Sequence, residues 1–216
     1  DLVIKANRRP NKGETIVGES FGMYIGGKGT NQAIAAARLG SSVHMVGCLG
    51  NDTFGKIILD TYQRERINTD FVIHDPFIGT GVGTPVIDKD GDNSIIIVPQ
   101  ANMMLTPDNV EAARKVIAKA DVLLIQLEIP IDVTQRAAEI AKNNGTVVIL
   151  NPAPASEIPE TLLNLIDILI PNKIEAEKLL KISINDDSSV KRVAEKFLSK
   201  GIGTVIITLG DEGSIL

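Results

Sequence analysis

Residues 26–32 (GGKGTNQ) combine closely spaced glycines with a cation and an amide, a set of groups that can bind a small polar ligand. They run directly into the apolar stripe of residues 33–40, which predicts a glycine-rich turn leading into the N-terminus of a helix. Glycines let a ligand approach the backbone closely, and the N–H groups of a first helical turn point toward it. Lys28 and Asn31 could then bind hydroxyl groups.

The turn does not match the usual nucleotide-phosphate motifs. Lys28 is followed by Gly29, whereas a Walker A loop needs Ser or Thr there, and Gln32 occupies the third glycine position of G-x-G-x-x-G. A polyol or sugar site fits the residues better. The alternative is a tight connection whose glycines only permit close helix packing.

Polar residues also follow four apolar runs that read as buried parallel strands. These residues are Gln126 and Glu128, Asn151, Asn172, and Thr208. In open parallel sheets ligands bind outside the carboxyl ends of the strands, so we expect these residues to converge on one crevice. Solvated turns would also place polar residues at strand ends, and that alternative stays open for any single position.

Two of these strand ends belong to longer motifs. Residues 208–213 (TLGDEG) have the glycine spacing of a tight turn between strands, and the turn could also let backbone lie against a planar or phosphate group. Asn172 opens a helix, and Glu175, three residues later, either completes a cap or holds a hydrated Mg²⁺.

Alternating helical and apolar strand patterns predict a layered α/β core with a mainly parallel sheet. The strands are expected over residues 43–49, 121–126, 146–150, 167–170 and 204–208. The helices are expected over residues 54–64, from Thr106-Pro107 onward with Val110, Ala113 and Ile117 on one face, and over 133–142, 174–180 and 190–198.

Two segments, 2–22 and 79–98, look instead like short strands joined by turns, with a hairpin at 89–92. We interpret residues 1–22 and 79–98 as a small β lid, and residues 23–78 and 99–216 as the α/β core. Pro85 lies inside one lid strand, which predicts an edge strand or a bulge there.

Composition narrows the function classes. The 216 residues carry a net charge of −5, no basic cluster and 3% aromatic residues, which argues against nucleic acid as a partner. No apolar run approaches the roughly 20 residues that span a bilayer, and no signal peptide is visible, so a cytoplasmic protein is expected. Cys48 lies in an apolar run and is interpreted as a buried inert thiol. His44 and His74 lack metal-ligand spacing.

Taken in order, the motifs resemble the ribokinase-like carbohydrate kinases over essentially the whole chain. The resemblance rests on residues 26–33 (GGKGTNQA), 36–40 (AARLG), 126–128 (QLE), 151–154 (NPAP), 171–177 (PNKIEAE) and 208–213 (TLGDEG).

The resemblance implies an α/β domain covered by a β lid, with a sugar between them and ATP beside it. The reaction would be transfer of the ATP γ-phosphoryl group to the primary hydroxyl of a pentose, with D-ribose as the leading substrate and ribose 5-phosphate as product, catalysed by positioning and charge neutralisation. Residues implied to hold sugar hydroxyls are Asp1, Gly26, Gly27, Lys28, Asn31 and Glu128.

On the nucleotide side, the resemblance implies that Asn172 serves the phosphates and that Thr208, Gly210 and Gly213 line the nucleotide. Glu175 would serve Mg²⁺, and a monovalent cation such as K⁺ remains open as an activator. Many relatives pair through their lids, so a homodimer is expected.

The chain departs from the family pattern in three places. It opens at Asp1, where the family has completed its first core strand, and it stops at Leu216, before the Gly-Ala-Gly-Asp segment that supplies the base and the anion hole. We therefore expect a fold incomplete at both ends, a base beyond Leu216, and a chain that is inactive as given. Gln100 stands where family members often have glycine.

Two other functions remain open. The chain could be a non-catalytic sugar-binding or regulatory protein that keeps the sugar site, or a kinase for another small sugar or a nucleoside.

Overall fold

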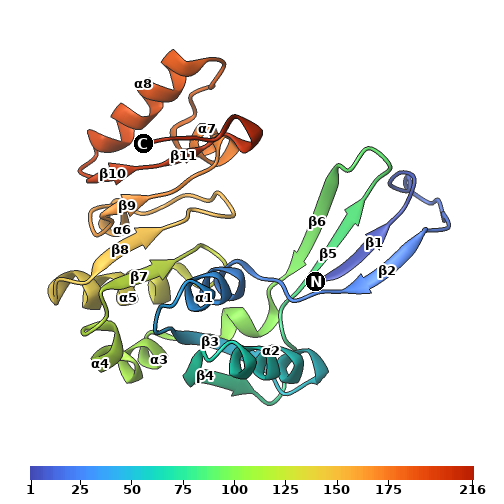
Figure 1. The fold of residues 1–216 in the computed structure, drawn as a ribbon, viewed down its shortest axis with the longest axis horizontal. Coiled ribbons are helices and arrows are strands. Elements are labelled where there is room, and N and C mark those ends of the chain that lie inside the picture. The colour runs from blue at the N-terminus through green and yellow to red at the C-terminus, as the bar shows by residue number, and fades with distance from the viewer. The chain divides into compact units, whose positions relative to one another are not determined.

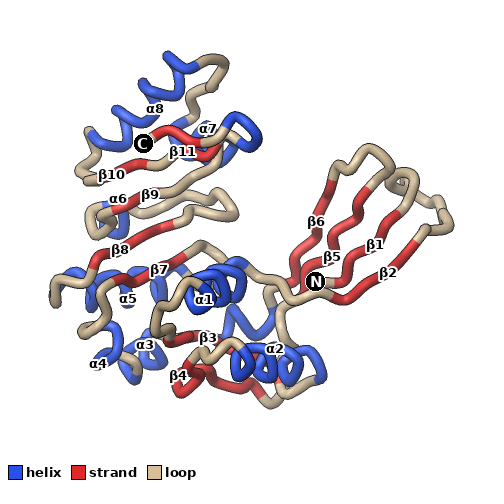
Figure 2. The backbone as a smooth tube through the Cα atoms, in the orientation of Figure 1, coloured by secondary structure: helices blue, strands red, loops and turns tan.

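A computed structural model describes residues 1–216, which divide into two compact units, Asp1–Met104 and Leu105–Leu216. Figure 1 labels the helices and strands, and Figure 2 separates them from the loops. The division between lid and core that the sequence suggests stays a prediction.

The first unit contains a four-stranded sheet made from the two predicted strand-rich segments. Its spatial order is β2-β1-β5-β6, in which β1 pairs parallel with β5 and the outer pairs are antiparallel. The strands are β1 (Leu2–Lys5), β2 (Ser20–Met23), β5 (Val82–Ile87) and β6 (Asn93–Val98). The predicted hairpin joins β5 to β6, and Asp88 Oδ1 accepts hydrogen bonds from the N–H groups of Asp90 and Asp92 at 3.1 and 3.0 Å.

Pro85 marks neither an edge strand nor a bulge, so both alternatives of that prediction are wrong: β5 lies between β1 and β6, and it pairs with β6 without a shift of register. The register explains how an internal strand accepts a proline. Only Val86 and Ile87 of β5 pair with β1, so Pro85 lies just before the parallel ladder begins.

The return from β6 passes through the 3₁₀ helix η1 (Gln100–Met104). Gln100 has a φ of 45°, in the left-handed region that glycine adopts most readily, and its Nε2 donates to Thr80 O at 2.9 Å. The backbone conformation is therefore one that glycine adopts more readily, and the Gln100 side chain adds a bond that glycine would lack.

The rest of the first unit packs two helices on a parallel strand pair. These elements are α1 (Lys28–Arg38), β3 (His44–Gly50), α2 (Thr53–Arg64) and β4 (Asn68–Asp75). Their core contains Ala33, Tyr62 and Ile67, and the Tyr62 hydroxyl forms a 2.7 Å hydrogen bond with Thr30 Oγ1. Burial raises the pKa of Tyr62, so the phenol remains neutral and the buried bond stays intact.

Asp52 fixes the start of α2 and the chain entering β5. Its carboxylate accepts from Gly55 N at 2.8 Å and from the Thr80 N–H and hydroxyl at 2.7 and 2.8 Å. Burial acts to raise the pKa of Asp52, but these hydrogen bonds outweigh it and the pKa lies below its ordinary value.

The second unit is built on an all-parallel sheet in the order β10-β9-β8-β7. The strands of this sheet are β7 (Val122–Ile125), β8 (Val147–Leu150), β9 (Ile168–Leu169) and β10 (Thr204–Val205). A separate two-stranded sheet contains β11 (Ile207–Thr208) and β12 (Ser214–Ile215). The helices of the second unit are α3 (Pro107–Ala112), α4 (Arg114–Ile117), α5 (Ile131–Asn143), α6 (Glu160–Leu163), α7 (Lys173–Leu180), α8 (Asp187–Leu198) and the 3₁₀ helix η2 (Gly210–Glu212).

The single strand predicted over 204–208 is interrupted at Ile206. The segment before the break pairs with β9, whereas β11 pairs antiparallel with β12. Because Ile206 N donates to Leu169 O at 2.9 Å, the chain still follows β9 across the break.

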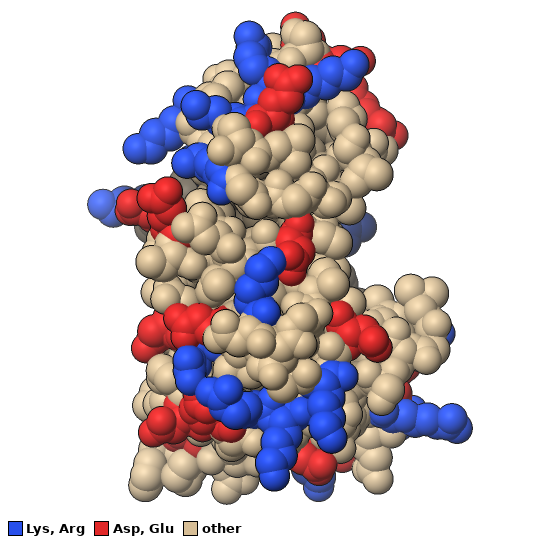
Figure 3. Space-filling model, turned by 90° about the vertical axis from the view of Figure 1, so that its left-hand side faces the viewer, with Lys and Arg blue, Asp and Glu red and all other residues tan.

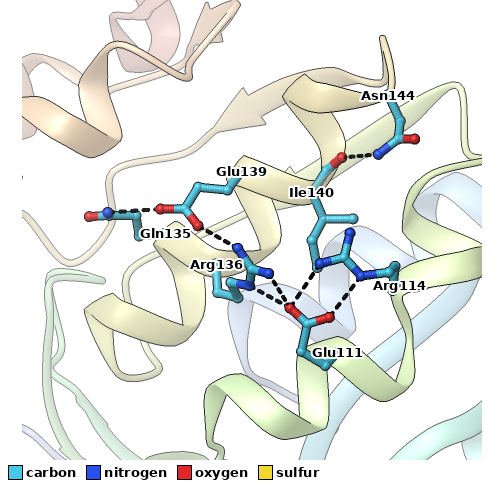
Figure 4. Close-up of polar contacts among 7 residues, drawn as sticks. All are labelled: Glu111, Arg114, Gln135, Arg136, Glu139, Ile140 and Asn144. Carbon is cyan, nitrogen blue, oxygen red and sulfur yellow. Dashed lines mark hydrogen bonds and ion pairs between the residues drawn. The ribbon is translucent and has the colours of Figure 1, made fainter.

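The predicted helix from Thr106 onward occurs as α3 and α4, which meet at Ala113. Val110, Ala113 and Ile117 are all buried, as the sequence pattern predicts. On the surface, Glu111 of α3 bonds to Arg114 and Arg136, and Arg136 also pairs with Glu139, so an ion-pair network links α3, α4 and α5 (Figure 4).

The prediction that Cys48 is a buried thiol is confirmed. Cys48 is buried, and burial raises the pKa of its thiol. No three His, Cys, Asp or Glu side chains gather as a metal site, and His44 and His74 are exposed. On the face drawn in Figure 3, positive and negative side chains are interspersed. None of the helices is long and apolar enough to cross a membrane.

Candidate functional site

The glycine turn of the first unit leads into a helix, as its sequence predicts. Helix α1 begins at Lys28, and its N-cap Gly27 has φ 86° and ψ 131°, a conformation that strains any residue with a Cβ. No side chain caps this helix, so its first turn keeps the partial positive charge of a helix N-terminus. The turn is therefore suited to binding groups that carry lone pairs.

Asp1 lies against this turn. Its backbone N donates to Tyr24 O at 2.8 Å and its O accepts from Tyr24 N at 3.0 Å, which fixes the residue beside the segment leading to Gly26. A Cβ at Gly26 would overlap the Asp1 carboxylate, and one at Gly83 would come within 2.5 Å of Asp1 Oδ1. The carboxylate therefore packs against two glycine backbones.

Gly83 is a residue that the sequence reasoning missed. A glycine inside a strand often marks the close approach of another group, and Gly83 lies inside β5. That signal was present but could not reveal that the approaching group is the carboxylate of Asp1, because the two residues are far apart in the chain.

The other two residues assigned to the sugar in this unit lie on the first turn of α1. Lys28 is half-buried, Asn31 is exposed, and Asn31 N donates to Gly27 O at 2.9 Å. Five of the six predicted sugar residues thus belong to one turn and the strand end beside it, where they offer a carboxylate, an ammonium, an amide and close backbone.

In the second unit, the polar residues that follow β7, β8 and β9 meet at the carboxyl end of the sheet. Asn151 N donates to Ile125 O at 3.0 Å, and Asn151 Nδ2 donates to Ile170 O at 2.9 Å. Asn172 and Thr208 form a parallel bridge. These strand ends therefore lie beside one another within this unit, and the crevice expected there stays a prediction.

Glu128, the sixth predicted sugar residue, stands on the loop after β7. Leu127 N donates to Ala153 O at 3.1 Å, which ties this loop to the segment after β8. The Glu128 side chain is half-buried. Its carboxylate thus belongs to the same edge of the sheet as Asn151.

Asn172 and Glu175 cap α7 reciprocally. Glu175 N donates to Asn172 Oδ1 and Asn172 N donates to Glu175 Oε2, both at 2.8 Å. The capping alternative raised by the sequence is therefore real. A lone carboxylate can still take part in holding Mg²⁺, which commonly takes one or two carboxylates and completes its shell with phosphates and waters. The residues present fit that kind of site.

The turn at 208–213 joins β11 to β12, as the glycine spacing predicts. Leu209 N donates to Gly213 O at 2.8 Å, and Gly210 and Gly213 have φ values of 68° and 90°. A Cβ at either glycine would meet no heavy atom within 4 Å, so the glycines serve the backbone conformation rather than internal packing. The turn thus presents exposed backbone beside Thr208.

Comparison with known proteins gives a consistent result. The family model described as pfkB family carbohydrate kinase matches residues 1–216. The ribokinase of Haemophilus influenzae is 41% identical over 213 residues, which cover 99% of this chain and 70% of the relative. The deoxyribokinase of Salmonella typhi is 32% identical over 216 residues, which cover 100% of this chain and 71% of the relative.

A solved structure agrees with the sequence matches. The structure of Arabidopsis thaliana ribokinase complexed with ribose and ATP has a TM-score of 0.87 and 32% sequence identity, covering 99% of this chain and 70% of that one. This likeness confirms the predicted α/β fold.

Proposed function

Since this chain belongs to the pfkB family of carbohydrate kinases, we propose that it acts as a ribokinase. The reaction is transfer of the γ-phosphoryl group of ATP to the primary hydroxyl of D-ribose, which gives ribose 5-phosphate and ADP. Both the Haemophilus and the Arabidopsis relatives are named ribokinases.

The observation that carries the proposal is the Asp1 carboxylate packed against Gly26 and Gly83 beside the start of α1. A carboxylate accepts two or more hydroxyl donors. At the neighbouring Gly27 a Cβ would meet only Thr30 Oγ1, at 3.8 Å, so that glycine leaves room for a ring to lie close to the backbone. A pentose presents several hydroxyls on a small ring, so this arrangement suits it better than it suits an apolar or anionic ligand.

Each amino-acid residue assigned to the sugar has a separate role in the proposal. Asp1 and Glu128 accept hydrogen bonds from sugar hydroxyls, whereas Lys28 and Asn31 donate to sugar oxygens. Gly26 and Gly27 provide close backbone. Together they orient the primary hydroxyl, and such positioning is the main protein contribution to phosphoryl transfer.

The nucleotide residues lie at the carboxyl end of the parallel sheet in the second unit. We assign Asn172 to the phosphates, and Thr208, Gly210 and Gly213 to the nucleotide, because the turn exposes backbone there. Glu175 would help to hold a hydrated Mg²⁺, which neutralises phosphate charge when it is bound. Activation by a monovalent cation such as K⁺ belongs to the same proposal.

A homodimer through the small sheet is the proposed assembly. Apolar side chains remain exposed on its two outer strands, with Phe21 64% and Ile96 71% exposed, and Met23 and Val98 exposed beside them. A second copy of the sheet would cover them. The cytosolic location expected from the sequence also stays a prediction.

The test is ribose-dependent release of ADP in the presence of Mg²⁺ and K⁺. It is measured on this chain and on the longest naturally encoded polypeptide that contains it. Ribose, 2-deoxyribose, fructose and a nucleoside are compared as acceptors, because a deoxyribokinase is among the relatives. Highest kcat/KM with ribose is the expected result. If the naturally encoded polypeptide binds ribose tightly but releases no ADP, the non-catalytic sugar-binding alternative is favoured.

A further inference from the structure

We infer that Asn151 is a positioning residue of this site: its side chain holds the strand end that carries Asn172 against the strand end that leads to Glu128. The inference deepens the proposed function and rests on it. Asn151 touches neither ligand in this account and acts through the backbone of its neighbours.

The backbone of Asn151 is tied to the segment after β7. Asn151 N donates to Ile125 O at 3.0 Å. Two residues later, Ala153 N donates to Asn151 O at 2.8 Å, while Ala153 O accepts from Leu127 N at 3.1 Å. These bonds fix the loop that carries Glu128 relative to Asn151.

The side chain of Asn151 is tied to the segment after β9, and the sequence explains why a side chain is needed there. Ile170 N donates to Leu150 O at 2.8 Å, so the next bond of the parallel ladder would run from the N–H of residue 152 to Ile170 O. Residue 152 is proline and has no N–H. Asn151 Nδ2 donates to Ile170 O at 2.9 Å and supplies the missing bond.

The consequence of this bond extends to the nucleotide residues. Pro171 follows Ile170 directly, and its carbonyl accepts from Thr208 N at 3.0 Å, next to the bridge between Asn172 and Thr208. A continuous backbone path therefore leads from Asn151 to Thr208. Loss of the Asn151 amide would loosen that path at its first step.

Asn144 provides a matched control, because it makes the same kind of bond away from the strand ends. Its Nδ2 donates to Ile140 O at 2.8 Å at the end of α5, before β8 begins (Figure 4). The alanine variant of either residue removes a hydrogen bond from a side-chain amide to a backbone carbonyl. Only the Asn151 bond reaches the segment that carries Asn172.

The experiment compares Asn151→Ala, Asn151→Asp, Asn144→Ala and the wild-type chain by calorimetric titration with a non-hydrolysable ATP analogue and with ribose, alongside thermal unfolding. We expect Asn151→Ala and Asn151→Asp to weaken binding of the ATP analogue about tenfold, the factor that corresponds to one lost hydrogen bond of typical strength. Asn144→Ala should lower Tm by a similar amount and change either Kd less than about twofold.

A rescue variant separates positioning from general destabilisation. Pro152→Ala placed in the Asn151→Ala background returns a backbone N–H at residue 152, which can donate to Ile170 O. The double variant should recover part of the lost nucleotide affinity even if its Tm does not recover.

Unchanged affinity for the ATP analogue in both Asn151 variants would overturn the inference, whatever their Tm. Equal losses of affinity in Asn151→Ala and Asn144→Ala would overturn it as well. Failure of the proposed function looks different: the wild-type chain itself would bind no ribose, while the effect of Asn151 on nucleotide binding would still be measured.

Discussion

The two ends of the parallel sheet in the second unit use polar residues in different ways. At the amino end, the Asp167 carboxylate accepts from Val148 N at 2.8 Å and pairs with Lys142, and the Thr146 hydroxyl donates to Ile117 O and Ala120 O. At the carboxyl end, Asn151 and Asn172 bond to backbone whose continuation carries the residues assigned to ligands.

This difference predicts that residues at the amino end of the sheet stabilise the fold, whereas residues at the carboxyl end determine ligand affinity. Polar groups at the amino end bond to buried backbone and to each other, so changes there should lower the free energy of unfolding and leave ligand affinity intact. Polar groups at the carboxyl end fix exposed loops, where ligands bind to open parallel sheets. Changes there should alter affinity more than stability.

The largest expected effect comes from Glu128→Ala at the carboxyl end. If the carboxylate binds a sugar hydroxyl, its loss removes a charge-assisted hydrogen bond, which is equivalent to about a 10- to 100-fold rise in the ribose Kd. Titration calorimetry checks this, with Asn31→Ala as a second sugar variant. Equal losses of ribose and ATP affinity would contradict the assignment.

Asp167→Ala should have the largest effect at the amino end. The change leaves Val148 N without its acceptor and Lys142 without its partner, and Val148 is fully buried. Loss of about 1–3 kcal/mol in the free energy of unfolding is expected, measured by urea denaturation. The ribose Kd should remain within twofold of wild type, and a larger change would break the division between the two ends.

The stabilisation from Asp167 should also depend on pH. Burial acts to raise the pKa of Asp167, but hydrogen bonds from Lys142 and from Val148 N, together with the charge of Lys142, place it below its ordinary value. The contribution is therefore complete above the unfolded pKa of about 3.9 and is lost as pH falls from there through the lower folded pKa. Urea denaturation is measured between pH 3 and pH 7. The difference in the free energy of unfolding between wild type and Asp167→Asn should narrow only at acidic pH.

Thr146→Val should have a smaller effect on stability. Thr146 is 3% exposed, and its hydroxyl reaches two carbonyls at 2.9 and 3.0 Å, whereas valine keeps the shape without the donor. We expect a loss of about 1 kcal/mol in thermal or urea unfolding and no change in either ligand's Kd. An unchanged free energy of unfolding would mean that the two carbonyls accept hydrogen bonds from other donors in Thr146→Val.

The smallest effect is expected from Arg136→Ala on the outer face of α5. Its partners Glu111 and Glu139 lie at the surface, and the Arg136 side chain is 34% exposed. Surface ion pairs contribute about 0–1 kcal/mol and are screened by salt. A Tm difference that persists in 1 M NaCl would contradict this view of the network in Figure 4.

Much of the second unit could be predicted because each of its buried strands is a short apolar run with a polar end. The predicted strands at 121–126 and 146–150 correspond to β7 and β8 within a few residues. The break at Ile206 could not be predicted, because an apolar run does not reveal where a strand changes partners from β9 to β12.

The first unit illustrates the same limit for pairing. The glycine turn, the start of α1 and the hairpin between β5 and β6 follow from local sequence, since turns and helix starts have local signals. The internal position of Pro85 and the contact between Asp1 and Gly83 depend on how β1 pairs with β5. Long-range register has no comparable local signal.

Calorimetric titration of ribose into the wild-type chain, Glu128→Ala and Asp167→Ala tests the central claim most directly. The account predicts ribose binding by the wild type, a Kd at least tenfold higher for Glu128→Ala, and a wild-type Kd for Asp167→Ala despite its lower Tm. Equal ribose affinity in wild type and Glu128→Ala, or loss of binding in Asp167→Ala while it remains folded, would contradict the account.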